Sequence, residues 1–382
     1  MCGKIHESRI TNVPWSTIPA IEKIFQKLYP NAQFAICPEW KQNYSITPLN
    51  IVDKFKDLCS MRGLLFDDNI QQGIEELFSL YPKEIYLIQY PKAERLSPLH
   101  FALLGHEIGH IFAEKWYEKS GAQLVGKIND EFLKIALAEF DASPFARQPL
   151  FRDNMSKTKA KQALDVFARV IKELVADAYG TMLFGKAFLV SAYLFSLRKQ
   201  IDDGSAWESG YLSWRYRILY INAALGSLAI KKPDPATTMS IGDWENLVED
   251  LLKQKPVESS ATNPYLTKIL QTHAAAESQI NDDVIADSKD EVFAFYLKAD
   301  HVNTVEERLY KGITPNATLD NDLKETPIEF RNILYGTFIL LAKVLKDTEY
   351  QNYEDIAGNI NRLSIKGIEL SIEQENFRDA HP

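Results

Sequence analysis

The segment Leu103-Leu-Gly-His-Glu-Ile-Gly-His-Ile-Phe112 determines how the rest of the chain is interpreted. It carries two histidines, His106 and His110, which are four positions apart and would lie on one face of a helix, one turn from each other. Both imidazoles could then point at one metal ion, with Glu107 beside them as a proton-transfer group. The segment therefore predicts a metal-binding helix.

The residues around this segment support a helix. Ser97 and Pro98 form a good helix start, with serine as the N-cap and proline at the first helical position. Gly121 follows a mostly apolar run and is the expected end of the helix. The alternative is a helix that carries two hydrogen-bonded histidines and a solvated glutamate.

A metal ion held by two histidines needs a further protein ligand, and the helical stretch 160–180 offers one. Val166, Val170, Glu173 and Asp177 share one stripe of this helix. Carboxylates that continue an apolar stripe are costly to bury unless they are paired or bound to a cation. Glu173 is therefore the expected ligand, and Asp177 is expected to hydrogen-bond a ligating imidazole.

The alternative for these two acids is an ordinary solvated helix face. In that case Glu173 would pair with a neighbouring cation such as Lys172 or Arg169.

Together these motifs resemble the gluzincin metallopeptidases. Glu-x-x-Ala-Asp at 173–177 is most similar to the Ste24/HtpX-type branch of that group. That branch also has a His-Pro pair followed by Arg-Ile. Arg217-Ile218 fits this pattern, whereas Tyr211-Leu212 replaces His-Pro. The resemblance covers roughly residues 83–230 and rests on short motifs.

The resemblance implies a role for each residue. His106, His110 and Glu173 would bind one zinc ion, Glu107 would be the general base, and Asp177 would orient a ligand. The implied reaction is hydrolysis of a peptide bond in a peptide or protein substrate.

A tetrahedral oxyanion usually needs a further hydrogen-bond donor. Tyr211 is the first candidate because it occupies the position of the family's histidine, and Arg217 is the second. Tyrosines in this aromatic, apolar stretch also commonly serve packing alone. His273 and His301 could reach the site as donors, but a surface position is the default expectation for both.

The run Ile85–Tyr90 reads as a strand bracketed by Pro82 and Pro91. Prolines limit strand pairing, which suits an edge strand that holds an extended substrate through its backbone. An ordinary core strand is the alternative.

The composition limits the classes of function. A net charge of −9 disfavours nucleic-acid binding and shows no polybasic membrane patch. The three cysteines, Cys2, Cys37 and Cys59, are not closely spaced and indicate a reducing compartment, so we expect a cytoplasmic protein. The stretch Ala178–Leu197 approaches membrane-spanning length, but Lys186 and several small polar residues favour a buried core helix that continues the Glu173 helix.

The expected fold is mainly α (α+β): a zincin-like catalytic core with a small β-sheet, flanked by helical N- and C-terminal regions. The expected regions are 1–82, 83–232 for the core and 233–382. The stretches Asn281–Glu291 and Pro315–Thr326 are expected to be loops. Further helices are predicted at Ser16–Leu28, Pro48–Met61, Asp68–Leu80, Trp244–Leu252, Tyr265–Ile280, Phe330–Lys346 and Ile356–Glu373.

Two other functions stay open. The centre could belong to a regulated, specific protease whose C-terminal region occludes the cleft or recognises a partner. Alternatively, the chain could be a non-proteolytic partner-binding protein that retains a zincin-like metal site. The sequence does not predict an oligomeric state.

Overall fold

The structure, a computed structural model, describes residues 18–39, 44–64, 66–78, 84–91, 97–143, 149–197, 211–231, 240, 244–253, 263–287, 298–319, 324–347 and 350–380. Most of these residues are helical, and the strands form a three-stranded and a two-stranded sheet. The predicted mainly helical fold with a small sheet is confirmed, and the zincin-like core stays a prediction.

Contacts between residues divide the chain into two compact units. Unit 1 joins the two ends of the chain, Met1–Pro98 and Lys289–Pro382, and unit 2 is the continuous stretch Leu99–Ser288. These boundaries differ from the three regions expected from the sequence, which stay a prediction.

Unit 1 contains the three-stranded sheet. The strand order is β1-β3-β2, with β1 (Ala32–Glu39) parallel and β2 (Ser45–Pro48) antiparallel to β3 (Glu84–Pro91). The strand predicted at Ile85–Tyr90 is therefore present, but it is the central strand, so the predicted edge position is wrong. Pro91 is compatible with a central strand because it lies at the last paired position, opposite Glu39. Pro82 lies outside the described residues.

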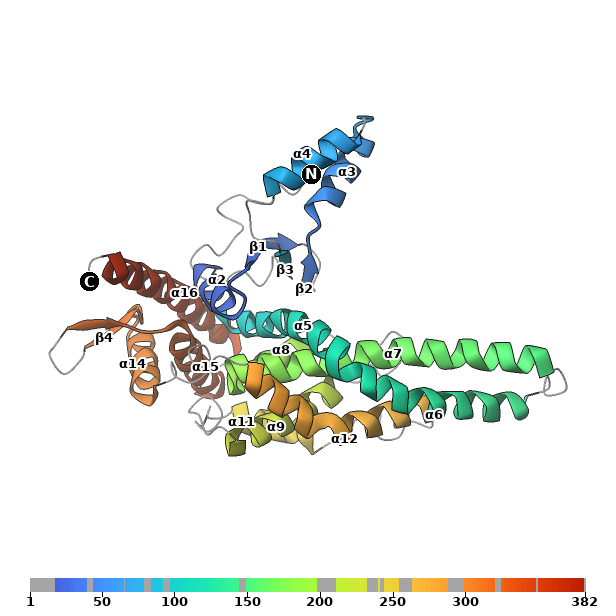
Figure 1. The fold of residues 1–382 in the computed structure, drawn as a ribbon. Helices are drawn as coiled ribbons and strands as arrows, with labels where there is room; N and C mark the ends of the chain where they lie inside the picture. The colour runs from blue at the N-terminus through green and yellow to red at the C-terminus, as the bar shows by residue number, and fades with distance from the viewer. Residues whose placement is uncertain are drawn as a thin grey trace. The chain divides into compact units, whose positions relative to one another are not determined.

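The predicted helices of unit 1 are present, although Ser16 and Leu80 lie outside the described residues (Figure 1). Two predicted bounds are wrong: Pro48 ends β2 rather than starting a helix, and α16 extends beyond Ile356–Glu373 at both ends. The predicted Pro315–Thr326 loop is wrong in part, because a short hairpin forms there. A helix at 299–310 was not predicted. The elements are α2 (Ile18–Leu28), α3 (Ile51–Met61), α4 (Asp68–Phe78), α14 (Ala299–Tyr310), β4 (Ala317–Leu319), β5 (Glu325–Pro327), α15 (Phe330–Asp347) and α16 (Tyr350–Ala380).

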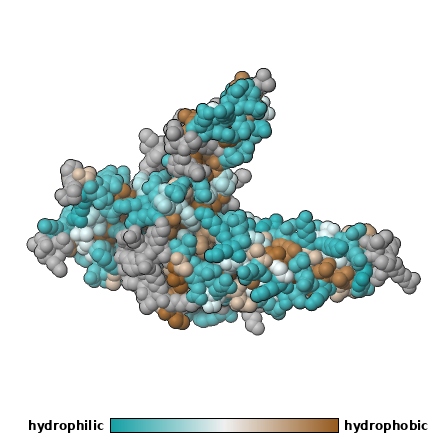
Figure 2. Space-filling view, viewed as in Figure 1, coloured by the Kyte–Doolittle hydropathy of each residue, from teal (hydrophilic) through white to brown (hydrophobic). Residues whose placement is uncertain are grey.

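Unit 2 is a bundle of helices in which α5 and α6 both lie along α7 (Figure 1). The view in Figure 2 shows the outer face of α6 and α7 as mostly hydrophilic, while α6 buries Ile128, Phe132 and Ala136 at four-residue spacing. The elements are a 3₁₀ turn (Pro98–Leu103), α5 (Leu104–Trp116), a π-helical turn (Tyr117–Gly121), α6 (Ala122–Asp141), α7 (Pro149–Phe184), α8 (Lys186–Leu197), α9 (Trp214–Lys231), α11 (Trp244–Leu252) and α12 (Pro264–Asp287).

The predicted helix end at Gly121 is wrong. Gly121 has helical backbone angles (φ −63°, ψ −32°), and the chain passes through the π-helical turn directly into α6. The glycine is needed for space, because a Cβ there would lie 2.5 Å from the ring of Tyr117.

The apolar stretch Ala178–Leu197 is a buried core structure, as predicted, but it is not one helix. Gly185 adopts φ 53° between α7 and α8, a left-handed conformation that ends α7. Among the described residues, no helix combines the length and the apolar character needed to cross a membrane. The predicted loop from Asn281 is also wrong as far as Asp287, where α12 ends.

Candidate metal centre

The candidate centre depends on an unusually close contact between α5 and α7. A Cβ on Gly109 would lie 2.7 Å from the backbone oxygen of Ala176, and a Cβ on Gly105 would lie 2.7 Å from the ring of Phe184. On the other helix, a Cβ on Gly180 would lie 3.0 Å from the backbone nitrogen of His106. Glycine at these positions lets the two backbones approach, which brings the histidines of α5 to the acids of α7.

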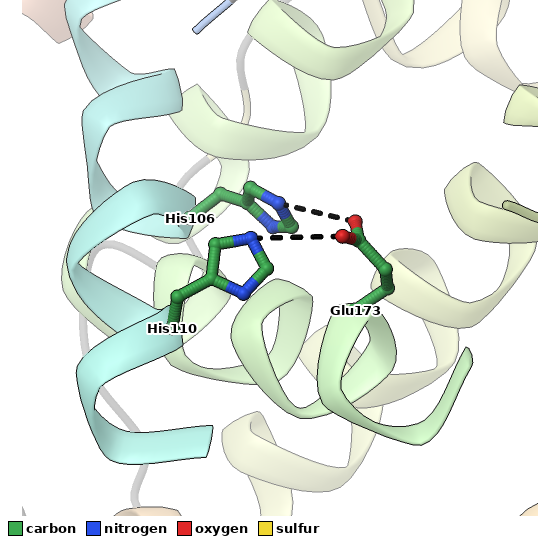
Figure 3. A group of neighbouring side chains, drawn as sticks. All are labelled: His106, His110 and Glu173. Carbon is green, nitrogen blue, oxygen red and sulfur yellow. Dashed lines mark ion pairs between the residues drawn. The ribbon is translucent and has the colours of Figure 1, made fainter. Parts of the chain in front are cut away.

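Three side chains converge across this contact. His106 and His110 extend from α5 toward Glu173 of α7 (Figure 3). One ligand atom from each of the three lies within 4.8 Å of the others. The Glu173 carboxylate oxygens lie 3.4 Å from His106 Nε2 and 3.7 Å from His110 Nε2. Two imidazoles and one carboxylate at this separation could hold a metal ion.

Asp177 lies one turn after Glu173 and is fully buried. Its Oδ1 lies 2.9 Å from His106 Nδ1, so Nδ1–H can donate to the carboxylate. This contact leaves Nε2 facing Glu173 and fixes the orientation of the ring. Asp177 is thus placed where the predicted orienting carboxylate would be.

Arg217 of α9 lies on the other side of Asp177. Its Nε and Nη2 donate to the two carboxylate oxygens at 2.8 and 2.7 Å, a bidentate pair. The guanidinium also stacks on Trp214, with 4.3 Å between its central carbon and the ring centroid. Nη2 lies 3.5 Å from Glu173 Oε2, so Arg217 also adjoins the ligand group.

The pKa values of the two histidines shift in opposite directions without a metal ion. Burial alone would lower the pKa of His106, but the charge and hydrogen bond of Asp177 and the hydrogen bond of Glu173 raise it to about 10. Burial, followed by repulsion from protonated His106, lowers the pKa of His110 to about 4. Burial opposes ionisation of Glu173, yet His106 and Arg217 lower the pKa of this carboxyl to about 2. Glu173 is therefore ionised at neutral pH, as a ligand must be.

The charge of the group suits a divalent cation. Glu173 and Asp177 carry ionised carboxylates, which protonated His106 and the Arg217 guanidinium offset when no metal ion is bound. A histidine must be neutral to act as a ligand, so metal binding removes the proton of His106. The cation then supplies the positive charge that this buried group would otherwise lose.

Glu107 and Tyr211 lie within electrostatic reach of this group. Glu107 is buried, with 6% of its surface exposed, so the predicted alternative of a solvated glutamate is wrong. Tyr211 is 53% exposed, and its pKa is raised chiefly by Glu173 and, after burial, also by Glu107.

The alternative of a solvated face for Glu173 is also wrong. Only 15% of its side chain is exposed, and Lys172 pairs with Glu114 rather than with Glu173. His273 contradicts its default surface position, because α12 buries it to 1% exposure. His301, in contrast, belongs to unit 1 and is half-buried.

Sequence reasoning missed the residues that support the site rather than those that form it. The glycines Gly105 and Gly109 flank His106 at four-residue spacing, and this pattern of small residues is a signal of close helix packing. The stacking of Trp214 on Arg217 has no comparable signal, because it joins the start of α9 to a charge network set by other helices.

The chain matches no protein-family model, and neither the curated proteins nor the solved structures contain a match to it. The resemblance to gluzincins therefore rests on the motifs, and the roles drawn from it stay predictions.

Proposed function

We propose that the protein is a zinc-dependent metallopeptidase that hydrolyses peptide bonds. One observation carries this proposal: His106, His110 and Glu173 converge within 4.8 Å, and buried Glu107 lies next to His106 on the same helix. Two imidazoles and a carboxylate leave a coordination position open on zinc, as catalytic sites require. A glutamate beside that position is what a hydrolase needs as a base.

Zinc, when bound, would polarise the substrate carbonyl and lower the pKa of a bound water to about 7. Glu107 would take a proton from the attacking water and return it to the nitrogen of the breaking C–N bond. Tyr211 would donate a hydrogen bond to the developing oxyanion, since this exposed residue lies close enough to feel the charge of Glu173.

Arg217 has a different role in this proposal from the predicted oxyanion donor. Two of its nitrogens are engaged by buried Asp177, and its face is covered by Trp214. It therefore holds Asp177 in place, and Asp177 in turn orients His106.

The proposal is tested by measuring zinc content and peptide cleavage in the Glu107→Gln variant. Glu118→Gln is the matched control, because Glu118 is exposed on the π-helical turn. We expect wild type to contain about one zinc ion per chain and to cleave a denatured protein or a peptide library. Glu107→Gln should keep its zinc and lose activity by a factor of about 10²–10⁴, and Glu118→Gln should match wild type.

A wild type that binds zinc but cleaves neither substrate would contradict the proposal and favour the partner-binding alternative. A wild type without affinity for zinc would remove the metal centre itself.

A further inference from the structure

Two buried side chains in the helices around the candidate centre each carry a polar atom without a hydrogen-bond partner among the described residues. They are Tyr220 of α9, through its hydroxyl, and His273 of α12, through Nε2. Tyr220 is 5% exposed and His273 is 1% exposed. Their rings meet edge to face, with centroids 4.7 Å apart and planes at 76°, so they form one cluster.

Helix contacts and charge connect this cluster with the Asp177–Arg217 pair, since α9 and α12 both contact α7. Tyr220 follows Arg217 by three positions on α9 and therefore lies near the same face of that helix. Burial raises the pKa of Tyr220 and lowers that of His273. The charge of Asp177 acts on both members of the cluster, since it adds to the first shift and opposes the second. Glu277, half-buried on α12, also acts on Tyr220.

Unpartnered polar atoms in such a position are unusual. Most buried side-chain polar atoms in proteins have at least one partner, either protein or ordered water. A buried water typically makes about three hydrogen bonds to groups that are otherwise unsatisfied. Tyr220 offers a hydroxyl that both donates and accepts, and His273 offers a ring nitrogen. Oδ2 of Asp177 accepts from Arg217 and has further acceptor capacity.

We propose that Tyr220 and His273 hold a buried water site between α9 and α12, and that this water supports the Asp177–Arg217 pair and so positions His106. The two residues are positioning residues, since neither adjoins the proposed ligand atoms. The positioning role rests on the proposed metal centre, whereas the water site does not.

The water site is tested by the sign of a stability change. If the hydroxyl of Tyr220 were buried without any partner, Tyr220→Phe would remove an unpaired polar group and raise the urea midpoint of unfolding. A hydroxyl bonded to water should instead lower the midpoint when it is removed. The double variant with His273→Leu should show a smaller loss than the sum of the single losses, because both side chains hold the same water.

A higher or unchanged midpoint for Tyr220→Phe would overturn the water site. Full additivity in the double variant would overturn the idea that the two residues share it. His273→Gln, which keeps a polar group near the position of Nε2, serves as a second variant and should retain most of the wild-type midpoint.

The positioning role is tested by titrating the full chain with Co²⁺, whose visible absorption reports ligand geometry. We expect His273→Leu to raise the Kd for Co²⁺ by about 10- to 100-fold, as losses behind metal ligands do, and His273→Gln to restore most of the affinity. Ile280→Ala, which removes only apolar contacts from the same helix, is the control for general loosening. It should lower the midpoint and leave the Kd and the spectrum unchanged.

Equal Kd values for wild type and His273→Leu would overturn the positioning role while leaving the metal centre in place. If wild type itself binds no Co²⁺, the proposed function and the positioning role are both contradicted. The water site is then tested by the unfolding midpoints alone.

Discussion

Units 1 and 2 place their charged residues differently. In unit 2, Asp177 and Arg217 form a pair in which the side chains are 0% and 7% exposed, and His106 adjoins both. In unit 1, ion pairs such as Lys23–Glu375 (44% and 29% exposed) keep contact with water. Exposed pairs of this kind can be rearranged at little cost, whereas the buried charges of the centre depend on one another.

This difference supports the proposed metal centre. Buried ion pairs often contribute less to stability than apolar residues of the same size would. A fold that needed only a core would place apolar side chains where Glu173 and Asp177 lie. Their presence at the contact of α5 and α7 is therefore better explained by chemistry than by folding.

The largest expected effect comes from breaking the buried pair. Arg217→Met should lower the free energy of unfolding by about 3–5 kcal/mol, because it removes the bidentate partner of buried Asp177 and leaves that carboxylate with His106 alone. Arg331→Met in unit 1 is the matched comparison. Its partner Glu329 is 20% exposed and still accepts from the backbone nitrogen of residue 331 at 2.8 Å.

The two variants are compared by urea unfolding of the metal-free full chain. A smaller loss is expected for Arg331→Met. Equal losses would mean that burial of the carboxylate is not what separates the two units.

The second prediction concerns glycines. Gly109→Ala should cost about 1–3 kcal/mol, because the new Cβ would overlap backbone atoms of Ala176 and force α5 away from α7. It should also weaken metal binding, since the histidines move away from Glu173. Gly73→Ala in α4 of unit 1 meets no atom within 4 Å and should stabilise by roughly 0.5–1 kcal/mol.

Thermal unfolding with and without zinc measures both changes. If Gly109→Ala is stabilising or leaves zinc affinity unchanged, the close contact is not what assembles the centre.

The third prediction concerns pH. Burial lowers the pKa of His273 to about 4, against an unfolded value of about 6.5. Well above pH 6.5, His273 is neutral in both the folded and the unfolded state, so its titration does not lower the stability there. As the pH falls from 6.5 toward 4, the unfolded state binds the proton first and stability decreases.

Between pH 6.5 and 5.5 this loss amounts to about 1 kcal/mol for one such histidine. His273→Gln should remove that share of the pH dependence. His301→Gln in unit 1 should remove less, because His301 is half-buried. Unfolding midpoints of the three proteins across this range provide the measurement. A pH dependence in His273→Gln equal to that of wild type would mean that His273 is solvated.

The same comparison explains how much could be predicted from sequence. In unit 2, the spacing of His106, His110, Glu173 and Asp177 along two helices was enough, because helical periodicity fixes which side chains share a face. The structure brings these four together as that spacing predicted. The burial of His273 was not predicted, since it depends on how α12 packs against α9.

Unit 1 was predicted less well because its structure depends on pairing between distant segments. β1 was not predicted, and it pairs in parallel with β3, 52 residues later along the chain in the register Ala32↔Glu84. No local pattern at 84–91 distinguishes a central strand from an edge strand. Only the partners decide this, and they come from elsewhere in the chain.

The smallest expected effect concerns an exposed ion pair of unit 1. Lys23→Ala removes the exposed contact with Glu375 and should cost about 0.2–1 kcal/mol in low salt. Because salt screens exposed charges, the cost should shrink toward zero in 1 M NaCl. The cost of Arg217→Met should persist in the same salt, since ions do not reach the buried Asp177. If 1 M NaCl abolished the loss of stability in both variants, the carboxylates of the centre would be solvated. They would then need no bound cation to balance their charge.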